Sequence, residues 1–98
     1  MNIHESAEDY LEAILALREQ QGMVRSIDIV HRLQLSKPSV SVAMKRLREN
    51  GYIEMDADGF ITLLPPGEEI AQRIYTRHKL LTQFLVRLGV SEDVATAD

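Results

Sequence analysis

Apolar residues recur along most of this chain at intervals of three and four, the spacing that places side chains on one face of an α-helix. In the first such segment, residues 7–21, the inward stripe is Ala7, Tyr10, Leu11, Ile14 and Leu17. Ser6, followed three residues later by Asp9, is typical of a helix start, and Gly22 is typical of a helix end. We therefore expect a first helix between Ser6 and Gly22.

Two shorter helical segments follow. Residues 26–35 predict a second helix that Ser26 can cap, with Ile27, Val30 and either Leu33 or Leu35 facing inward. Residues 36–50 predict a third helix, in which Ser36 is the N-cap, Pro38 is tolerated in the first turn and Gly51 is the stop. Its inward residues are Val40, Met44 and Leu47. Because about three residues separate the two helices, they predict a helix-turn-helix.

The pattern then changes to alternation in "YIEMDADGFITLL", which predicts a β-hairpin around Asp-Ala-Asp-Gly. Pro65, Pro66 and Gly67 interrupt the chain before a long helix from Glu68 to about Leu88. That helix has one apolar stripe, which Arg77 interrupts: Ile70, Ile74, Leu81, Phe84, Leu85 and Leu88. The predicted fold class is mainly α with a small β-hairpin, a winged helix-turn-helix followed by a long linking helix.

Composition narrows the class of protein. The 98 residues suit one small domain or part of a longer chain, and they include no cysteine, which excludes disulfides and thiolate metal sites. No run of about 18 apolar residues indicates a membrane span, and the acidic start "MNIHESAEDY" is unlike a signal peptide. We expect a cytoplasmic protein with no membrane contact.

The charge is unevenly distributed. The net charge is −4, but residues 25–50 carry six basic residues against two acidic ones, whereas the segments on either side are each acidic. An acidic total argues against indiscriminate binding to nucleic acid. A local basic face permits binding to double-stranded DNA through a single element.

That element is the third helix, whose outward face remains once its core residues are removed. Small polar residues near its start can reach bases and phosphates, Lys45 and Arg46 suit phosphate or guanine, and Val42 suits a thymine methyl. The candidate DNA-binding residues are Arg25, Ser36, Lys37, Pro38, Ser39, Ser41, Val42, Lys45 and Arg46. Simple surface charge is the alternative for this face and equally for Arg25 and Arg32. The hairpin carries Glu54, Asp56 and Asp58, which would repel phosphates.

A second candidate group is acidic. Asp9 and Glu12 are three residues apart and share the face of the first helix opposite its apolar stripe, where Glu5 and Ala16 also lie. His78 lies at the edge of the stripe of the long helix. Two carboxylates and an imidazole suit a divalent ion. A solvated acidic face and a packing histidine remain the alternatives.

The segments "SAEDYLEAILALREQQG", "SKPSVSVAMKRLRENGYI" and "RIYTRHKLLTQFLVRLGV" resemble the N-terminal part of the diphtheria-toxin-repressor family, and more closely its manganese-transport-regulator branch. The resemblance implies a metal-dependent DNA-binding repressor of metal-ion homeostasis, in which Asp9, Glu12 and His78 bind manganese(II) or iron(II). The metal would fix the first helix against the long helix and set the spacing of two recognition helices in a homodimer. It also implies a DNA-binding domain at residues 1–65, followed at 66–98 by the long helix and the start of a dimerisation domain.

This chain departs from the family pattern after the long helix. Family members continue through dimerisation helices that supply further metal ligands, whereas this sequence stops at Asp98. We therefore expect a fragment or truncated relative that binds metal weakly and dimerises poorly. Two alternatives stay open: a metal-independent winged-helix DNA-binding protein, and a winged-helix protein-interaction module, which the acidic balance favours. The chain has no nucleophile–base motif or glycine-rich phosphate loop, so we do not expect an enzyme.

Overall fold

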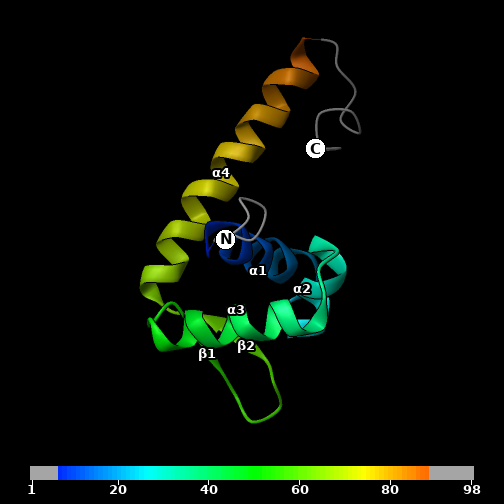
Figure 1. The fold of residues 1–98 in the computed structure, drawn as a ribbon. Helices are drawn as coiled ribbons and strands as arrows, with labels where there is room; N and C mark the ends of the chain where they lie inside the picture. Colours follow the sequence, from blue (N-terminus) through cyan, green and yellow to red (C-terminus); the bar gives the residue numbers. More distant parts are fainter. Residues whose placement is uncertain (1–6, 89–98) are drawn as a thin grey trace.

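The computed structural model describes residues 7–88. Their elements follow one another as α1 (Ala7–Gln21), α2 (Ser26–Leu33), α3 (Lys37–Glu49), β1 (Ile53–Met55), β2 (Ile61–Leu63) and α4 (Pro65–Arg87). In Figure 1, α3 and the hairpin lie at one end of the molecule, α1 crosses above them, and the second half of α4 extends away from the other elements. This is the winged helix-turn-helix with a long following helix that the sequence predicts, so the fold prediction is confirmed.

Helix α1 lies at the centre of the core. It contacts α2 and α3 on the side of the helix-turn-helix, and it packs most extensively against α4. Tyr10, Leu11 and Ile14 are fully buried as predicted, whereas Ala7 is exposed. Ala16, which we placed on the face opposite the apolar stripe, is only 5% exposed. The alternative of a solvated face is therefore wrong at Ala16, because α4 packs along α1 and covers part of that face.

The helix-turn-helix packs as its apolar pattern predicts in α3, and in α2 at Val30, Leu33 and Leu35 but not at Ile27. Val40, Met44 and Leu47 are buried, which confirms the inward face of α3. In α2 the fully buried residue is Ile29, whereas Ile27 is 37% exposed. The N-cap is Arg25 rather than Ser26, and its backbone N–H donates to the Asp28 carboxylate at 2.8 Å. This α2 segment is too short for its stripe to fix which apolar residue faces inward, so contacts with α1 and α3 decide it.

The hairpin is short and antiparallel, with Ile53 opposite Leu63 and Met55 opposite Ile61. Its turn is closed by Asp56, whose Oδ1 accepts backbone N–H groups from Asp58 and Phe60, both at 2.9 Å. The N–H of Ile61 donates to the carbonyl of Val24 at 2.8 Å. The hairpin is therefore attached to the segment between α1 and α2 as well as to the end of α3.

Helix α4 begins at Pro65, three residues before the predicted start. Proline is favourable at the first helical position because its missing N–H has no partner there in any helix. Glycine is required at Gly67, where an added Cβ would lie 2.2 Å from the Tyr52 carbonyl oxygen. The same carbonyl accepts the N–H of Leu64 at 3.0 Å. The start of α4 is thus held closely against the chain between α3 and β1.

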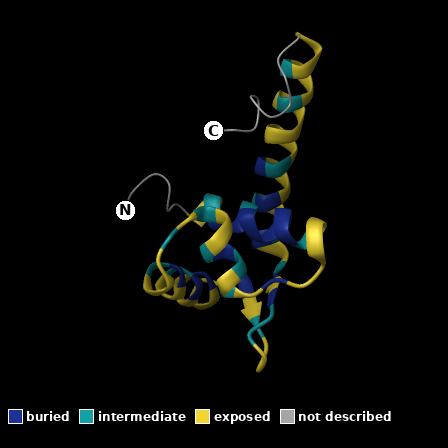
Figure 2. Cartoon of the chain, turned by 90° about the vertical axis from the view of Figure 1, so that its right-hand side faces the viewer, coloured by how far each residue is buried: buried dark blue, intermediate teal, exposed yellow. Residues whose placement is uncertain are grey.

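Only the first half of α4 belongs to the core. Ala71 and Ile74 are buried, but Leu81, Phe84 and Leu88 of the predicted stripe are each more than half exposed. Figure 2 shows the buried colour at the base of this helix and mainly the exposed colour further along it. Within residues 7–88, no helix has both the length and the apolar character needed to cross a membrane.

Candidate DNA-reading surface and candidate metal pair

The turn between α2 and α3 positions the candidate reading helix. Gln34 adopts a left-handed conformation with φ of 55°, and its N–H donates to the Val30 carbonyl, which ends α2. Ser36 then caps α3 by accepting the N–H of Ser39 at 3.2 Å. A serine cap satisfies one of the N–H groups that a helix start otherwise leaves unpaired. The turn and the cap together fix the direction in which α3 leaves the core.

The face of α3 opposite its core residues is open to solvent, as the sequence predicts. Ser36, Lys37, Pro38, Ser41, Lys45 and Arg46 are exposed, and Ser39 is half-buried. Val42 lies in the middle of this face and is 52% exposed. The surface has the small polar residues, the cations and the apolar contact that base reading requires.

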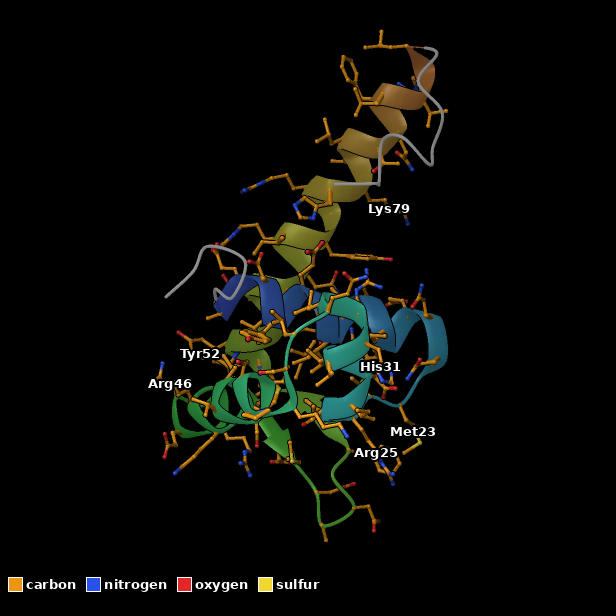
Figure 3. All side chains as sticks on the ribbon, turned by 45° about the vertical axis from the view of Figure 1, so that its right-hand side comes forward. Met23, Arg25, His31, Arg46, Tyr52 and Lys79 are labelled. Atoms are coloured by element: carbon orange, nitrogen blue, oxygen red, sulfur yellow. The ribbon has the colours of Figure 1, made fainter. Side chains whose placement is uncertain are left out.

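Arg25 occupies a different place from the other candidates. Its guanidinium carbon lies 4.2 Å from the centre of the Phe60 ring, a cation–π contact with the hairpin. In Figure 3, Arg25 lies beside the hairpin, on the other side of the molecule from Arg46. The structure therefore brings Arg25 against the hairpin at Phe60, and not to the flank of α3 that carries Arg46.

A groove of about 590 Å³ runs along one flank of α3. Its floor includes the buried residues Tyr10 and Leu47, and its rim includes Arg46 and Tyr52. The remaining lining residues come from the start of α1 and from α3 and its C-cap: Ala7, Pro38, Ser39, Val42, Ala43 and Asn50. Sequence analysis did not find this groove, because α1 and Tyr52 reach α3 only through the fold.

The structure brings together two of the three predicted metal ligands. Glu12 of α1 and His78 of α4 are 66 residues apart in the sequence, and His78 Nδ1 lies 2.5 Å from Glu12 Oε2. A carboxylate only accepts, so Nδ1 donates to Oε2. Two neighbouring ligand atoms that bind one ion at about 2.0–2.3 Å and at right angles lie about 2.8–3.3 Å apart, so this hydrogen bond must open slightly for both atoms to bind the same ion. A carboxylate oxygen and an imidazole nitrogen also suit manganese(II) or iron(II).

Asp9 lies one turn before Glu12 on α1 and is half-buried. Within the described part of the chain, no group of three or more histidine, aspartate and glutamate side chains is arranged to hold a metal ion. Glu12 and His78 therefore form a two-residue pair, which we call the metal pair. Asp9 is not part of a three-ligand cluster with it.

A polar contact that the sequence analysis missed joins α1 to α4 at another point. Arg18 Nη1 and Nη2 donate to the two carboxylate oxygens of Glu68 at 2.6 and 2.9 Å. The hydrogen bond from Arg18 lowers the pKa of Glu68, and a further bond from Gln72 acts in the same direction. The same contact raises the pKa of Arg18. No local pattern could have revealed a pair that is 50 residues apart in the sequence.

A helix-turn-helix with an exposed basic helix, a hairpin directly after it and a long following helix defines the winged-helix class of DNA-binding proteins. Residues 2–59 match the family described as "Iron dependent repressor, N-terminal DNA binding domain". The chain belongs to this family, which confirms the resemblance drawn from its sequence segments.

Characterised relatives support the same assignment. The chain is 38% identical over 94 residues to "Transcriptional regulator MntR" of Salmonella typhimurium, with 96% of this chain and 60% of the relative covered. It is 39% identical over 88 residues to "HTH-type transcriptional regulator MntR" of Geobacillus kaustophilus, with 90% and 62% covered. The solved "Structure of the manganese regulator SloR" is similar with a TM-score of 0.69 and 26% identity, over 94% of this chain and 45% of that one. The chain thus spans about 60% of the length of these MntR relatives.

Proposed function

We propose that this chain is the DNA-reading part of a metal-dependent transcriptional repressor that responds to manganese(II) or iron(II). Its family and its similarity to MntR proteins and to a manganese regulator support this proposal. The observation that carries it is the contact between Glu12 and His78. That contact joins two ligand types suited to these ions at the junction between the DNA-binding helices and α4.

The proposed partner is double-stranded DNA. Helix α3 is inserted in the major groove, because its outward face combines exposed cations with small polar side chains near its N-terminal end. Val42 contacts a thymine methyl, and Lys45 contacts a base edge or a phosphate. The acidic hairpin stays back from the duplex, since Glu54, Asp56 and Asp58 would repel phosphates.

Glu12 and His78 would hold the ion. Asp9, on the same helix face, lies outside this pair and would have to leave its present partner to add a carboxylate. A bound divalent cation would supply positive charge and a fixed coordination geometry in place of the hydrogen bond between the two side chains. Glu12 and His78 lie on α1 and α4, so an ion held by both fixes the angle between these helices. Two or three protein ligands leave much of an octahedral coordination sphere unfilled, so we expect weak binding by this chain.

The proposed assembly is a homodimer that uses the second half of α4. Leu81, Phe84 and Leu88 follow one another at helical spacing and are 54%, 56% and 65% exposed. An isolated apolar side chain on a surface is common, but a continuous exposed row along one helix face indicates an interaction surface. Sedimentation of the chain at increasing concentration tests this proposal.

The metal role is tested by measuring DNA affinity with and without the ion. The probe is a duplex selected by this chain from a random pool, with binding followed by fluorescence anisotropy in EDTA, in manganese(II) and in magnesium(II). We expect manganese(II) to tighten binding by about fivefold or more, within the usual range of coupling between sites. Glu12→Gln and His78→Gln should abolish this response. Glu69→Gln removes one exposed carboxylate of α4 without touching the metal pair, and should preserve it.

A metal-independent DNA-binding protein is the second candidate, and one observation favours it. Glu12 and His78 already form a direct hydrogen bond, so α1 is joined to α4 without an ion. Equal affinity of the wild-type chain in EDTA and in manganese(II), together with weaker binding by His78→Gln in EDTA, would favour this candidate over the metal-dependent one.

A further inference from the structure

The groove beside α3 is bordered by Arg46, which also belongs to the outward face of α3, and by Tyr52, which lies outside that face. Tyr52 is half-buried against the core, and its hydroxyl has no hydrogen-bond partner within residues 7–88. The guanidinium of Arg46 likewise forms no ion pair within the described part of the chain. Both groups are donors, and both border the groove. Figure 3 shows Arg46 and Tyr52 side by side at one end of α3.

The position of these donors on α3 identifies what they can reach. Ser39, Arg46 and Asn50 are spaced by seven and four residues, so they follow one flank of the helix and its C-cap. Lys45 and Arg48 lie on the opposite flank, where they and Glu49 border a second, smaller depression of about 320 Å³. The major groove is about 12 Å wide, so a helix inserted in it has a sugar–phosphate backbone on each flank. The groove therefore faces the path of one DNA strand.

Resting on the proposed function, we propose that this groove binds the sugar–phosphate backbone of one strand, with Arg46, Tyr52 and Asn50 donating to phosphate oxygens. Arginine, tyrosine and asparagine side chains are common donors to DNA phosphates. Asn50 already donates through Nδ2 to the Arg46 carbonyl at 2.8 Å, which orients its amide and leaves a second N–H. The apolar floor of the groove receives the deoxyribose, which has no charge to accommodate.

The charges around the groove are compatible with a phosphate. Ala7 borders the groove at the start of α1, and the next residue is Glu8. The Glu8 carboxylate lies 4.0 Å from Nη2 of Arg73 on α4, so part of its charge is balanced on that side. Asp9 also has a partner. Arg46 therefore remains the cation nearest to the groove, since no other lysine or arginine lines it.

This assignment gives Arg46 and Lys45 different roles although they are adjacent. A phosphate contact adds affinity for every DNA sequence and contributes to salt dependence, whereas a base contact adds affinity for the chosen sequence only. The experiment measures binding of the wild-type chain, Arg46→Ala and Tyr52→Phe to the selected duplex and to an unrelated duplex of equal length. Each measurement is repeated over a series of salt concentrations.

We expect Arg46→Ala to weaken binding to both duplexes by the same factor, and to reduce the slope of log affinity against log salt by about one. Tyr52→Phe should weaken both by about three- to tenfold, the range for one lost hydrogen bond, and leave the slope unchanged because no charge is removed. Tyr75→Phe removes a hydroxyl from a half-buried tyrosine on α4, away from the groove, and is the matched control. It should bind both duplexes like the wild type.

A second measurement removes the charge of one DNA phosphate at a time instead of a side chain of the protein. Single phosphates of the selected duplex are replaced in turn by methylphosphonate. At the contacted phosphate, the replacement should lower the DNA affinity of the wild-type chain. It should not lower the affinity of Arg46→Ala any further, because that variant has already lost the same contact. Independent effects of the two changes at every phosphate would overturn the assignment.

The outcomes separate this inference from the proposed function. If Arg46→Ala loses affinity for the selected duplex but not for the unrelated one, Arg46 contacts a base, and the backbone site is overturned. Unchanged affinity of both variants for both duplexes would overturn it as well, while α3 could still be the reader. Failure of the wild-type chain to bind any duplex, with a normal folded circular-dichroism spectrum, would overturn the proposed function and the backbone site together.

Discussion

Replacing Gly67 by alanine tests how closely α4 is held against the rest of the core. An added Cβ would lie 2.2 Å from the Tyr52 carbonyl oxygen and 3.0 Å from its carbon, whereas ordinary contacts begin at 3.4 Å. Both atoms belong to the backbone, so no side-chain rotation relieves the overlap. The start of α4 must therefore move by about 1 Å, which also strains the hydrogen bond from the Leu64 N–H to the Tyr52 carbonyl.

The size of the effect follows from three contributions. Overpacking typically costs about 1–3 kcal/mol, and weakening one hydrogen bond costs about 0.5–1.5 kcal/mol. Against these, alanine favours a helix interior over glycine by about 0.8–1.0 kcal/mol. We expect Gly67→Ala to lower the free energy of unfolding by about 1–3 kcal/mol, and the melting temperature by about 5–20 °C for a chain of this size.

Thermal and urea unfolding followed by circular dichroism measure this change. Thr76→Ala, an exposed substitution on the same helix, is the control and should shift the melting temperature little. Leu11 Cδ2 lies 3.3 Å from the added Cβ, so the cost of Gly67→Ala is also measured in a Leu11→Ala chain, where it would vanish only if the Leu11 side chain caused the clash. A Gly67→Ala chain as stable as the wild type, or a Gly67→Ala change that costs nothing in the Leu11→Ala chain, would refute the close backbone approach of α4.

Three further outcomes follow from contacts described above. The lowered pKa of Glu68 means that its ion pair with Arg18 contributes stability above the ordinary glutamate pKa of about 4.3 and loses it as pH falls through the lowered value. Glu68→Gln should remove this contribution to the pH dependence of the free energy of unfolding. The contribution is less than about 1 kcal/mol, because both side chains are about one-third exposed, and urea titrations at several pH values measure it. Met44→Ala should destabilise the chain by about 2–5 kcal/mol, because Met44 is 1% exposed in the core, and calorimetry measures this directly. Lys45→Ala should weaken binding to the selected duplex by about 1–3 kcal/mol if Lys45 contacts a base edge and by less if it contacts a phosphate, and anisotropy with both duplexes distinguishes the two.

Much of the fold could be predicted because it depends on local patterns. The helical spacing of Val40, Met44 and Leu47 indicated the inward face of α3, and the Asp-Gly turn indicated the hairpin. Predictions failed where a distant element decided the outcome. Ala16 is buried because α4 packs along α1, and Ile29 replaces Ile27 because neighbouring helices select the face of a short segment.

The candidate site divides in the same way. The outward residues of α3 could be read from the helical period once its core face was known, and the structure exposes them. The meeting of Glu12 with His78 was expected from the family resemblance, not from spacing, because 66 residues separate them. The groove could not be expected from either source, since Tyr10, Arg46 and Tyr52 converge there from separate parts of the chain.

Helix α4 is packed against the core at one end only, so a small change of its angle moves its other end by several ångströms. Ile74 is its last buried residue within the described chain, and the 14 residues from there to Leu88 extend for about 21 Å at about 1.5 Å per residue. Glu12 contacts this arm at His78, one turn beyond its fixed end. A tilt of about 10° at Ile74 displaces the far end by about 4 Å over this length of about 21 Å. That distance is close to the spacing of about 3.4 Å between successive base pairs. In the proposed repressor, a small change in the angle between α1 and α4 at Glu12 and His78 would therefore move the end of the arm by about one base-pair step.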